Sequence, residues 1–212
     1  MEAKDHIRIG LIKCSEGNYL GSIDNFSLAI QKDPENDKAY NYRGFAKNKI
    51  GSFSYALQDL DKALELNSNL GEAYRNRGYS KIKIGYLQSA IDDCKKSIKI
   101  IPDCFICYFL MGLATDLLDQ PIQAKLYFDE SISINPSYYY ALNYRGKSLK
   151  KLGFRDKALD DWNEAIQINP KYFDAYKNIF NELKDDEDFE SAMKVLDIFI
   201  STNREDHPKY IE

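Results

Sequence analysis

Residues 139–172 read YYALNYRGKSLKKLGFRDKALDDWNEAIQINPKY, and this stretch carries the pattern that decides the fold. Its first half places Leu142, Gly146 and further apolar residues at helical spacing and predicts a helix, which ends at Gly153 because glycine readily adopts a positive φ. The second half predicts another amphipathic helix through Ala158, Leu159, Trp162, Ala165 and Ile166. Pro170 ends it, since the residue before a proline avoids helical dihedral angles.

The same pattern returns every 34 residues along the chain. One series keeps the phase of the first-helix glycine: Gly10, Gly44, Gly78, Gly112 and Gly146. A second series puts a small residue at one phase of the second helix: Ser22, Ala56, Ala90, Ala124, Ala158 and Ala192. A third series is Pro34, Pro102, Pro136 and Pro170. A strict period of this length predicts a stacked array, in which each repeat buries its apolar face against its neighbours.

We therefore predict an all-α fold made of six helix–turn–helix repeats in a single domain. The repeats are residues 3–36, 37–70, 71–104, 105–138, 139–172 and 173–206, followed by a short tail, 207–212. The hydrophobic content of 44% is enough for a continuous core and too high for a disordered chain.

Small residues are predicted wherever two helix axes approach closely. A larger side chain at Gly146 or Ala158 would overpack the crossing, at a cost of about 1–3 kcal/mol. A further small series is predicted to admit the first helix of the next repeat: Ala29, Ala63, Ser97, Ser131 and Ala165. Gly17, Gly51 and Gly85 repeat the stop made by Gly153, whereas repeat four has Asp119 and then Pro121, so its turn is predicted to differ.

The period, with glycine, alanine and proline at fixed phases, resembles the tetratricopeptide repeat over nearly the whole chain. The resemblance implies a right-handed superhelical α-solenoid that acts as a non-catalytic scaffold and binds extended peptides along its concave wall of first helices. Repeat six departs from the pattern with Phe180 for the glycine and Phe199 for an alanine, and it lacks the closing proline. It is either a cap or a degenerate repeat, and Leu196, Phe199 and Ile200 are predicted to expose apolar surface because the tail is too short for a capping helix.

Arginine and aspartate occur together in three of the repeats. Arg43, Arg77 and Arg145 precede the glycine, and an aspartate follows each of them 16 residues later: Asp59, Asp93 and Asp161. The other three repeats have neither residue at these phases. We predict one ion pair within each hairpin, because a charge beside a helix crossing is normally kept only when it is paired. The alternative is a row of arginines that binds a phosphate or carboxylate of a ligand.

The resemblance places peptide binding on the inward phases of the first helices. The predicted peptide-binding residues are Tyr42, Phe45, Lys49, Arg75, Asn76, Tyr79, Lys83, Phe109, Leu110, Leu113, Tyr144, Lys147, Lys150 and Lys151. Across all six repeats the inward cations are Lys4, Arg8, Lys38, Lys49, Arg75, Lys83, Lys147, Lys150, Lys151, Lys177 and Lys184. The inward anions are Glu72, Asp116, Asp174 and Asp185.

Eleven cations against four anions give this wall a charge of +7 in a chain whose net charge is −4. Such segregation attracts an acidic partner to one face. We predict an extended acidic peptide that places an apolar or aromatic side chain on the apolar patch of repeat four. The alternative is that the lysines only solvate an exposed helix face and that the patch packs internally.

No constellation of catalytic or metal-binding residues is found in the sequence. Cys104 and Cys107 form a lone C-x-x-C at a predicted helix start, without the other ligands of a zinc site, and are interpreted as structural thiols. Cys94 falls on an apolar phase and is predicted to lie in the core. His6 and His207 are isolated, and the acidic run from Asp185 to Asp188, which lacks the spacing of a calcium loop, is interpreted as a solvated turn. We expect no enzymatic activity and no cofactor or metal.

The net charge, the hydropathy and the cysteines limit the classes of partner that the chain is expected to bind. The negative net charge argues against a general nucleic-acid binder, and no apolar stretch is long enough to span a membrane. Four cysteines without a secretory signal favour a reducing, cytoplasmic location. The predicted partner is a protein or peptide. The alternative to peptide binding is a structural solenoid that self-associates through its exposed C-terminal repeat.

Overall fold

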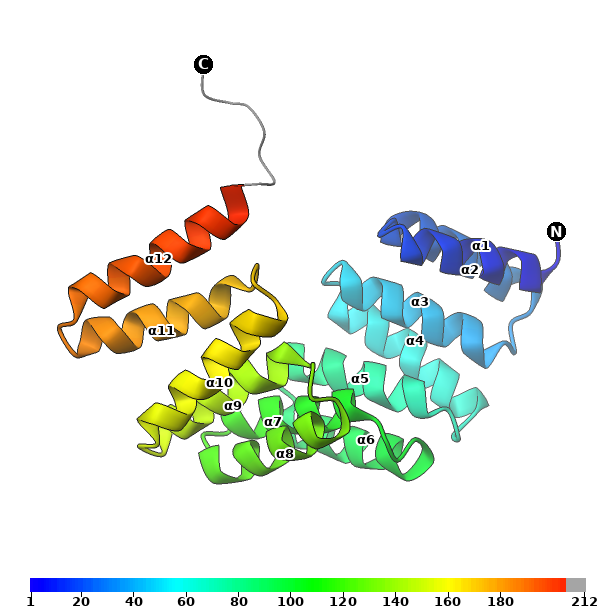
Figure 1. Cartoon of the computed structure of the whole chain (residues 1–212). Helices are drawn as coiled ribbons and strands as arrows, with labels where there is room; N and C mark the ends of the chain where they lie inside the picture. Colours follow the sequence, from blue (N-terminus) through cyan, green and yellow to red (C-terminus); the bar gives the residue numbers. More distant parts are fainter. Residues whose placement is uncertain (205–212) are drawn as a thin grey trace, which may run out of the picture. The chain divides into compact units, whose positions relative to one another are not determined.

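The computed structural model describes residues 1–204, so the predicted tail, 207–212, and the end of repeat six lie outside the described part. Within residues 1–204 the secondary structure is twelve α-helices joined by short turns, without a strand (Figure 1). The helices are α1 (Ala3–Ser15), α2 (Tyr19–Lys32), α3 (Asp37–Lys49), α4 (Phe53–Leu66), α5 (Gly71–Lys83), α6 (Leu87–Ile100), α7 (Phe105–Leu117), α8 (Pro121–Ile134), α9 (Tyr139–Lys151), α10 (Arg155–Ile168), α11 (Phe173–Asp185) and α12 (Phe189–Arg204). None of these helices is both long enough and apolar enough to cross a membrane.

Every odd-numbered helix begins at the first residue of a predicted repeat, and the next helix follows after a turn. The prediction of an all-α helical repeat solenoid is therefore confirmed. The chain divides into two compact blocks, the N-terminal block (1–118) and the C-terminal block (119–212), with the division between α7 and α8. The single domain stays a prediction, and each block is described by itself.

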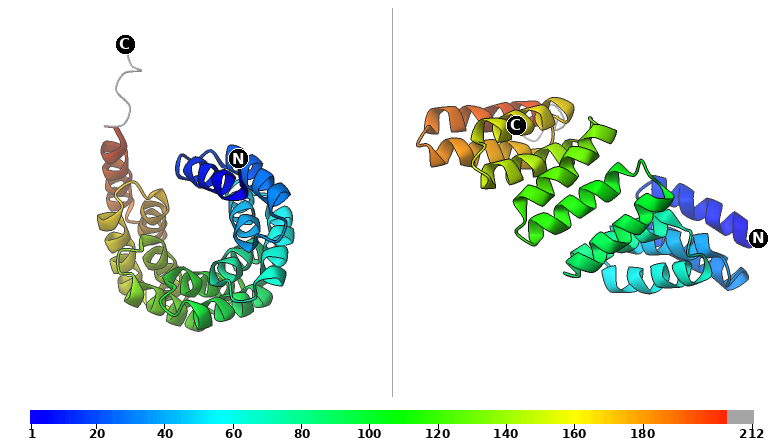
Figure 2. Two further views of the ribbon diagram at one scale, coloured as in Figure 1. Left: turned by 90° about the vertical axis from the view of Figure 1, so that its right-hand side faces the viewer. Right: turned by 90° about the horizontal axis from the view of Figure 1, so that it is seen from below.

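In the N-terminal block, helices adjacent in sequence pack against one another from α1 to α7. The first helices α1, α3, α5 and α7 also contact each other in succession, whereas the second helices α2, α4 and α6 do not. Elements on the inner side of a curved stack lie closer together than those on the outer side. The first helices of this block therefore form its inner face, and Figure 2 shows the helices of this block, α1 to α7, stacked along a curve.

The C-terminal block repeats this arrangement from α8 to α12. Helix α9 contacts α11, whereas α8 does not contact α10 and α10 does not contact α12 among the described residues. Its inner face is thus formed by α9 and α11. A core cluster that includes Leu142, Trp162 and Ile179 runs through α9, α10 and α11.

All of the turns within the hairpins share one backbone conformation. Gly51 has a φ of 78°, Gly153 has 81°, and Asp119 in repeat four has 56°. The prediction that the turn of repeat four differs is wrong, because aspartate is one of the few residues that tolerates the left-handed region. Pro121 fits there as the first residue of α8, where its missing N–H has no helical partner.

The small residues stand where the helices cross closely, as predicted. A Cβ atom at Gly146 would lie 2.5 Å from Trp162 Nε1, and one at Gly10 would lie 2.5 Å from Phe26 Cε1. The five residues predicted to admit the next repeat are fully buried: Ala29, Ala63, Ser97, Ser131 and Ala165.

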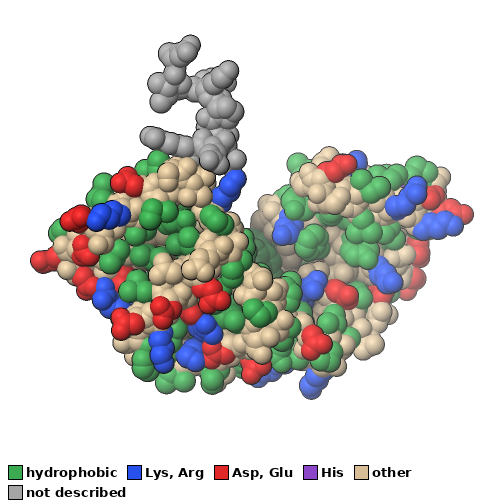
Figure 3. Space-filling view, viewed as in Figure 1, with side chains coloured by type: hydrophobic (Ala, Val, Ile, Leu, Met, Phe, Trp, Pro, Cys, Tyr) green, Lys and Arg blue, Asp and Glu red, His purple; other side chains and the backbone are tan. Residues whose placement is uncertain are grey.

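Repeat six is packed more loosely than the others on its outer helix. Phe199 is half-buried, and its ring centroid lies 5.1 Å from the rings of both Phe173 and Tyr176. The predicted exposure is confirmed for Ile200 but wrong for Leu196 and Phe199, which are half-buried. Further exposed apolar residues lie on α12: Phe189, Met193 and Ile198. In Figure 3 hydrophobic side chains lie among charged ones in the region of α11 and α12.

Candidate functional site

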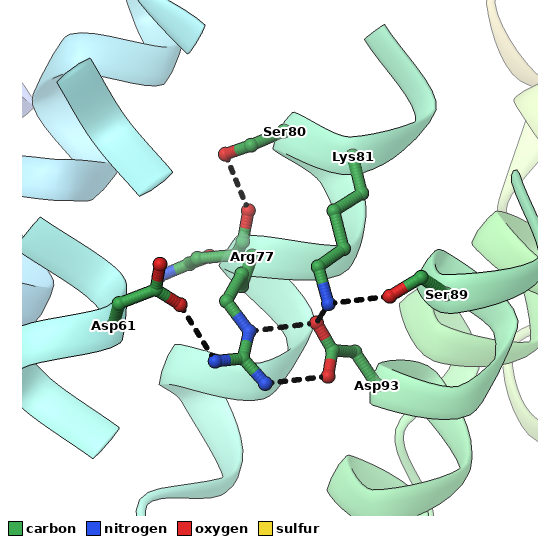
Figure 4. Close-up of polar contacts among 7 residues, drawn as sticks. Asp61, Arg77, Ser80, Lys81, Ser89 and Asp93 are labelled. Atoms are coloured by element: carbon green, nitrogen blue, oxygen red, sulfur yellow. Dashed lines mark hydrogen bonds and ion pairs between the residues drawn. The ribbon is translucent and has the colours of Figure 1, made fainter. Parts of the chain in front are cut away.

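The predicted ion pairs within the hairpins are confirmed in all three repeats. In repeat three, Arg77 Nε donates to Asp93 Oδ2 at 2.8 Å and Nη2 donates to Oδ1 at 2.7 Å (Figure 4). Arg43 and Asp59 form the same two bonds at 2.9 and 2.7 Å. Parallel bonds of this kind are the strong, geometrically specific form of an arginine–carboxylate contact.

The remaining nitrogen of each arginine binds the preceding repeat. Arg77 Nη1 donates to Asp61 on α4 at 2.7 Å, and Arg145 Nη1 donates to Asp129 on α8 at 3.0 Å. The alternative of an arginine row that binds a ligand is therefore wrong, because these guanidinium groups are already occupied. Burial alone would lower the pKa of Arg77, but its bonds to Asp93 and Asp61 outweigh burial and raise that pKa above its ordinary range.

Two lysines on the inner face of the N-terminal block rest on aromatic rings. Lys49 Nζ lies 5.3 Å from the ring centroid of Phe45 on α3, and Lys83 Nζ lies 5.4 Å from that of Tyr79 on α5. Both lysines are exposed, and within residues 1–204 neither forms an ion pair. Arg75 on α5 likewise has no carboxylate within ion-pair distance in the described part. These predicted site residues therefore share one face and keep their positive charge uncompensated.

Asparagines connect the inner helices. The Asn76 side chain donates to Asn41 Oδ1 at 2.9 Å, and Asn178 donates to Asn143 in the same way at 2.8 Å. Asn48 donates to the backbone oxygen of Asn76 at 3.0 Å. Asn76 was expected to contact a peptide, but it is buried and its amide holds α5 against α3. The sequence contains the signal for this role, because both asparagine pairs are separated by 35 residues.

The apolar patch predicted in repeat four comprises Ile106, Phe109, Leu110, Leu113 and Leu117, and it is only partly covered, since Leu117 is 56% exposed. Phe109 is 8% exposed and Leu110 is 3% exposed, so a peptide could reach them only if the surrounding residues moved. Leu113 is half-buried, and so is Tyr42, whose ring centroid lies 5.7 Å from that of Phe26. The alternative interpretation, that the patch packs internally, fits Phe109 and Leu110.

Two of the inner lysines of the C-terminal block, Lys150 and Lys151, are paired with acidic residues. Lys150 Nζ lies 2.5 Å from Glu182 Oε2 and 3.2 Å from Asp185 Oδ2, and the two carboxylates raise its pKa. Lys151 Nζ lies 3.5 Å from Asp119 Oδ1. Lys147 Nζ lies 4.5 Å from the ring centroid of Tyr144, which is half-buried.

Glu182 is the residue of this network that the sequence did not reveal. It is buried on α11, accepts a hydrogen bond from Arg155 Nε at 3.0 Å and ties the start of α10 to repeat six. Arg155 also pairs with Asp186. The acidic run is exposed at a turn, as interpreted, and Asp185 and Asp186 also form ion pairs there.

Cys94, Cys104 and Cys107 are buried, whereas Cys14 is half-buried. Cys104 immediately precedes α7, as predicted, and its sulfur lies 2.9 Å from that of Cys107. The contact with Cys104 lowers the pKa of Cys107, but its contact with Cys94 and its burial outweigh this and raise that pKa to about 12. Cys94 is fully buried, as predicted for a core residue. A thiol with a raised pKa is a poor nucleophile. Across residues 1–204, His, Cys, Asp and Glu side chains form no group of three or more suited to a metal ion.

The repeats and the fold were compared with those of known proteins. Sequence models of the tetratricopeptide repeat match residues 71–104 and 139–172, which are repeats three and five. A search of curated proteins found no match. Among solved structures the chain is similar to MamA, with 26% identity over 77% of this chain and 95% of that chain and a TM-score of 0.66.

Two further solved structures share the fold at lower identity. The tetratricopeptide repeat protein TTC0263 of Thermus thermophilus has 17% identity over 85% of this chain and 98% of that chain, with a TM-score of 0.72. YrrB, described as a tetratricopeptide repeat protein with an unusual peptide-binding site, has 24% identity over 84% and 92%, with a TM-score of 0.62. Proteins of this fold are generally non-catalytic protein-interaction scaffolds. The chain therefore contains tetratricopeptide repeats at residues 71–104 and 139–172 and shares the repeat fold with these structures.

Proposed function

We propose that the chain is a non-catalytic scaffold that binds an extended, acidic segment of a partner protein on the inner face of its N-terminal block. The observation that carries the proposal is the pair of lysines, Lys49 and Lys83, held over Phe45 and Tyr79 without a carboxylate partner among the described residues. The peptide-binding residues retained in the proposal are Tyr42, Phe45, Lys49, Arg75, Tyr79 and Lys83.

The aromatic rings position the ammonium groups while leaving their donors available. A lysine over a ring gains about 0.5–1 kcal/mol at an exposed site and loses part of its freedom before any ligand arrives. Its three N–H donors remain able to bind a carboxylate, and the ring edge offers apolar contact to a neighbouring side chain. Less ordering is then needed on binding, which favours affinity.

The spacing of the two lysines sets a register for the ligand. Lys49 and Lys83 occupy the same phase of α3 and α5, which contact each other and are joined by the Asn41–Asn76 bond. Packed helices lie about 8–10 Å apart. An extended chain advances about 3.3 Å per residue. Acidic residues three positions apart in the partner would therefore reach both lysines.

The comparisons support a peptide as the ligand class without identifying it. YrrB is described as having a peptide-binding site, and at 24% identity its likeness to this chain concerns the fold. The net charge of −4 and the absence of a membrane-spanning helix among the described residues support a protein partner over a nucleic acid or a membrane. Four free cysteines support a cytoplasmic location.

The test is binding of short, fluorescently labelled peptides rich in Glu and Asp, measured by anisotropy. We expect a double variant, Lys49→Glu with Lys83→Glu, to weaken binding at least about tenfold, or 1.4 kcal/mol. The matched control is Lys95→Glu with Lys99→Glu on α6, which makes the same change of charge on the outer side of the same block. Equal losses in the two double variants would refute a specific face.

Salt gives a second readout of the same proposal. Raising the ionic strength from 0.01 to 0.15 M shortens the Debye length from about 30 to about 8 Å. We expect the affinity for acidic peptides to fall across this range and the affinity for matched basic peptides to stay undetectable. Binding that is insensitive to salt would rule out charge as the source of selectivity.

Self-association through α12 is a second candidate function, favoured by the exposed Phe189, Met193, Ile198 and Ile200. Ile198→Glu tests it without disturbing the fold, because Ile198 is exposed whereas Phe199 packs on Phe173 and Tyr176. We expect the mass measured by light scattering to rise with concentration for the wild type and not for Ile198→Glu. A monomer at every concentration would remove this candidate.

A further inference from the structure

The Arg–Asp pairs of the repeats differ in one neighbouring residue. One helical turn after the arginine, repeat two has Lys47 and repeat three has Lys81. The ammonium of Lys47 lies 2.7 Å from Asp59 Oδ2, and that of Lys81 lies 2.7 Å from Asp93 Oδ2. In Figure 4 Lys81 reaches Asp93 beside the guanidinium of Arg77. Each of these buried carboxylates therefore has two cations.

Repeat five has Leu149 at the position of the lysine. Asp161 accepts both of its hydrogen bonds from Arg145, at 2.8 and 2.6 Å, and has no ammonium partner among the described residues. Its exposed fraction is 5%, the same as that of Asp59. Burial raises the pKa of Asp161, against the lowering effect of Arg145. The carboxylate of repeat five is thus as buried as its counterpart and less well compensated.

A cavity occupies the place where the lysine would lie. Its volume is about 280 Å³, and Leu149, Arg145, Asp160 and Asp161 line it together with side chains of α8. One water molecule takes up about 30 Å³ in the liquid, so the space exceeds that of an alkylammonium group. The cavity lies wholly within the C-terminal block, between α8, α9 and α10.

The other charged residues that line the cavity are Lys125, Asp129, Lys157 and Asp160. Lys125 pairs with Asp129 at 2.7 Å, and Asp129 also receives Arg145 Nη1 at 3.0 Å. Lys157 lies over the ring of Phe154, with Nζ 5.4 Å from the centroid, and forms no ion pair within residues 1–204. Asp160 is exposed at the rim. The acceptors left for a new donor are the carboxylates of Asp161 and Asp160.

We propose that this cavity binds a primary ammonium group, as carried by a lysine side chain of a partner, at the carboxylate of Asp161. The ligand takes the position that Lys47 and Lys81 take within their own repeats, with its alkyl chain against Leu149 and its donors directed to Asp161 and Asp160. This site lies on α8, α9 and α10, apart from the inner-face lysines on α3 and α5, and does not depend on the proposed function.

The test is a titration of the full chain with n-butylammonium chloride, followed by the NMR signals of the Leu149 methyl groups and Arg145 Nε–H. We expect a saturable shift that sodium chloride and n-butyltrimethylammonium, which has no N–H donor, do not produce. Leu149→Lys supplies the missing ammonium and should weaken binding at least tenfold, read from Arg145 Nε–H, whereas the matched control Leu149→Met should retain it. An equal shift with sodium chloride, or full binding by Leu149→Lys, overturns the proposal.

Two further variants keep the result decisive if Leu149→Lys fails to fold. Lys81→Leu recreates the cavity in repeat three and should gain a second ammonium site, seen at Arg77 Nε–H. Lys157→Met removes the one nearby lysine that could enter the cavity, and the proposal expects it to leave binding unchanged or tighter. No gain in Lys81→Leu, or binding that appears only in Lys157→Met, overturns the proposal, since the latter would make Lys157 the native occupant.

A last experiment distinguishes a lysine side chain of a partner protein from a free amine as the source of the ammonium group. A short peptide blocked at both ends and carrying one lysine is titrated beside n-butylammonium. Binding of the peptide at least as tightly as the free amine supports a protein partner. Binding of the amine with exclusion of the peptide overturns the partner lysine and leaves a small amine as the ligand.

Discussion

Repeats three and five are built alike and differ in how their charges are used. Both match the family's sequence models, and both hold a bidentate Arg–Asp pair beside a close-packed glycine. On the outer side, Lys81 completes the network of repeat three, whereas Leu149 leaves a cavity in repeat five. On the inner side, Lys83 is uncompensated within the described residues, whereas Lys150 and Lys151 are paired with acidic residues.

The difference shows that the 34-residue period determines where the helices and turns lie. It does not determine which charged side chains are left without an ion-pair partner. Counting inward cations gives the same sign to both blocks. The contacts distinguish them, because a lysine already bound to Glu182 and Asp185 offers little to a ligand. Binding is therefore expected at Lys49 and Lys83, which form no ion pair within the described residues, rather than at Lys150 and Lys151.

The largest expected effect comes from removing a shared carboxylate. Asp93→Ala leaves Lys81 without its carboxylate and Arg77 with Asp61 alone, and breaking a buried pair in this way costs about 3–5 kcal/mol. Asp161→Ala should cost less, because Arg145 likewise keeps Asp129 and no lysine is orphaned. Urea unfolding followed by circular dichroism measures both. Equal losses, or a larger loss for Asp161→Ala, would contradict the difference between the two networks.

The next largest difference between repeats three and five is expected when alanine replaces the glycine at the helix crossing. A Cβ atom at position 146 would lie 2.5 Å from Trp162 Nε1, whereas one at position 78 would lie 3.0 Å from the more adaptable Cys94 sulfur. Gly146→Ala should lose about 1–3 kcal/mol through overpacking. Gly78→Ala should be close to neutral, because the helix gains about 1 kcal/mol from the replacement. The same unfolding measurement applies, and a Gly146→Ala variant as stable as the wild type would show that Trp162 adjusts freely.

The smallest expected loss of stability comes from replacing Lys81. Lys81→Leu makes repeat three resemble repeat five and should cost about 1 kcal/mol, since Asp93 keeps Arg77 as its partner. Leu149→Met, a change of similar volume in repeat five, should cost less than about 1.5 kcal/mol. A loss above about 3 kcal/mol in Lys81→Leu, the scale of a broken buried pair, would mean that the lysine, rather than the arginine, holds the network together.

Much of the skeleton could be predicted because the chain repeats itself. Helices, turns and the Arg77–Asp93 pair each follow from residues that recur at fixed phases, so one repeat checks another. The turn at Asp119 was missed because a single residue that tolerates positive φ replaces glycine without changing the backbone. Such exceptions depend on which backbone conformations a residue tolerates, and the spacing of residues in the sequence does not reveal this.

The candidate site was less predictable because its properties depend on contacts between repeats. The pairing of Lys150 with Glu182 joins α9 to α11 and appears at no recurring phase, and the burial of Phe109 cannot be deduced from its inward position. The Asn41–Asn76 bond could have been found, since a second pair has the same separation. The aromatic–lysine pairs were named as separate residues, and only the structure shows them in contact.

The central claim is that acidic peptides bind to α3 and α5, and chemical-shift mapping tests it most directly. A Glu-rich peptide is titrated into the isotope-labelled chain while the ring and amide signals of Phe45, Tyr79, Tyr144 and Tyr176 are followed. The account predicts the largest saturable shifts at Phe45 and Tyr79, which lie under Lys49 and Lys83, and smaller shifts at Tyr144 and Tyr176. Shifts confined to α9 and α11, or spread evenly over both blocks, would contradict it.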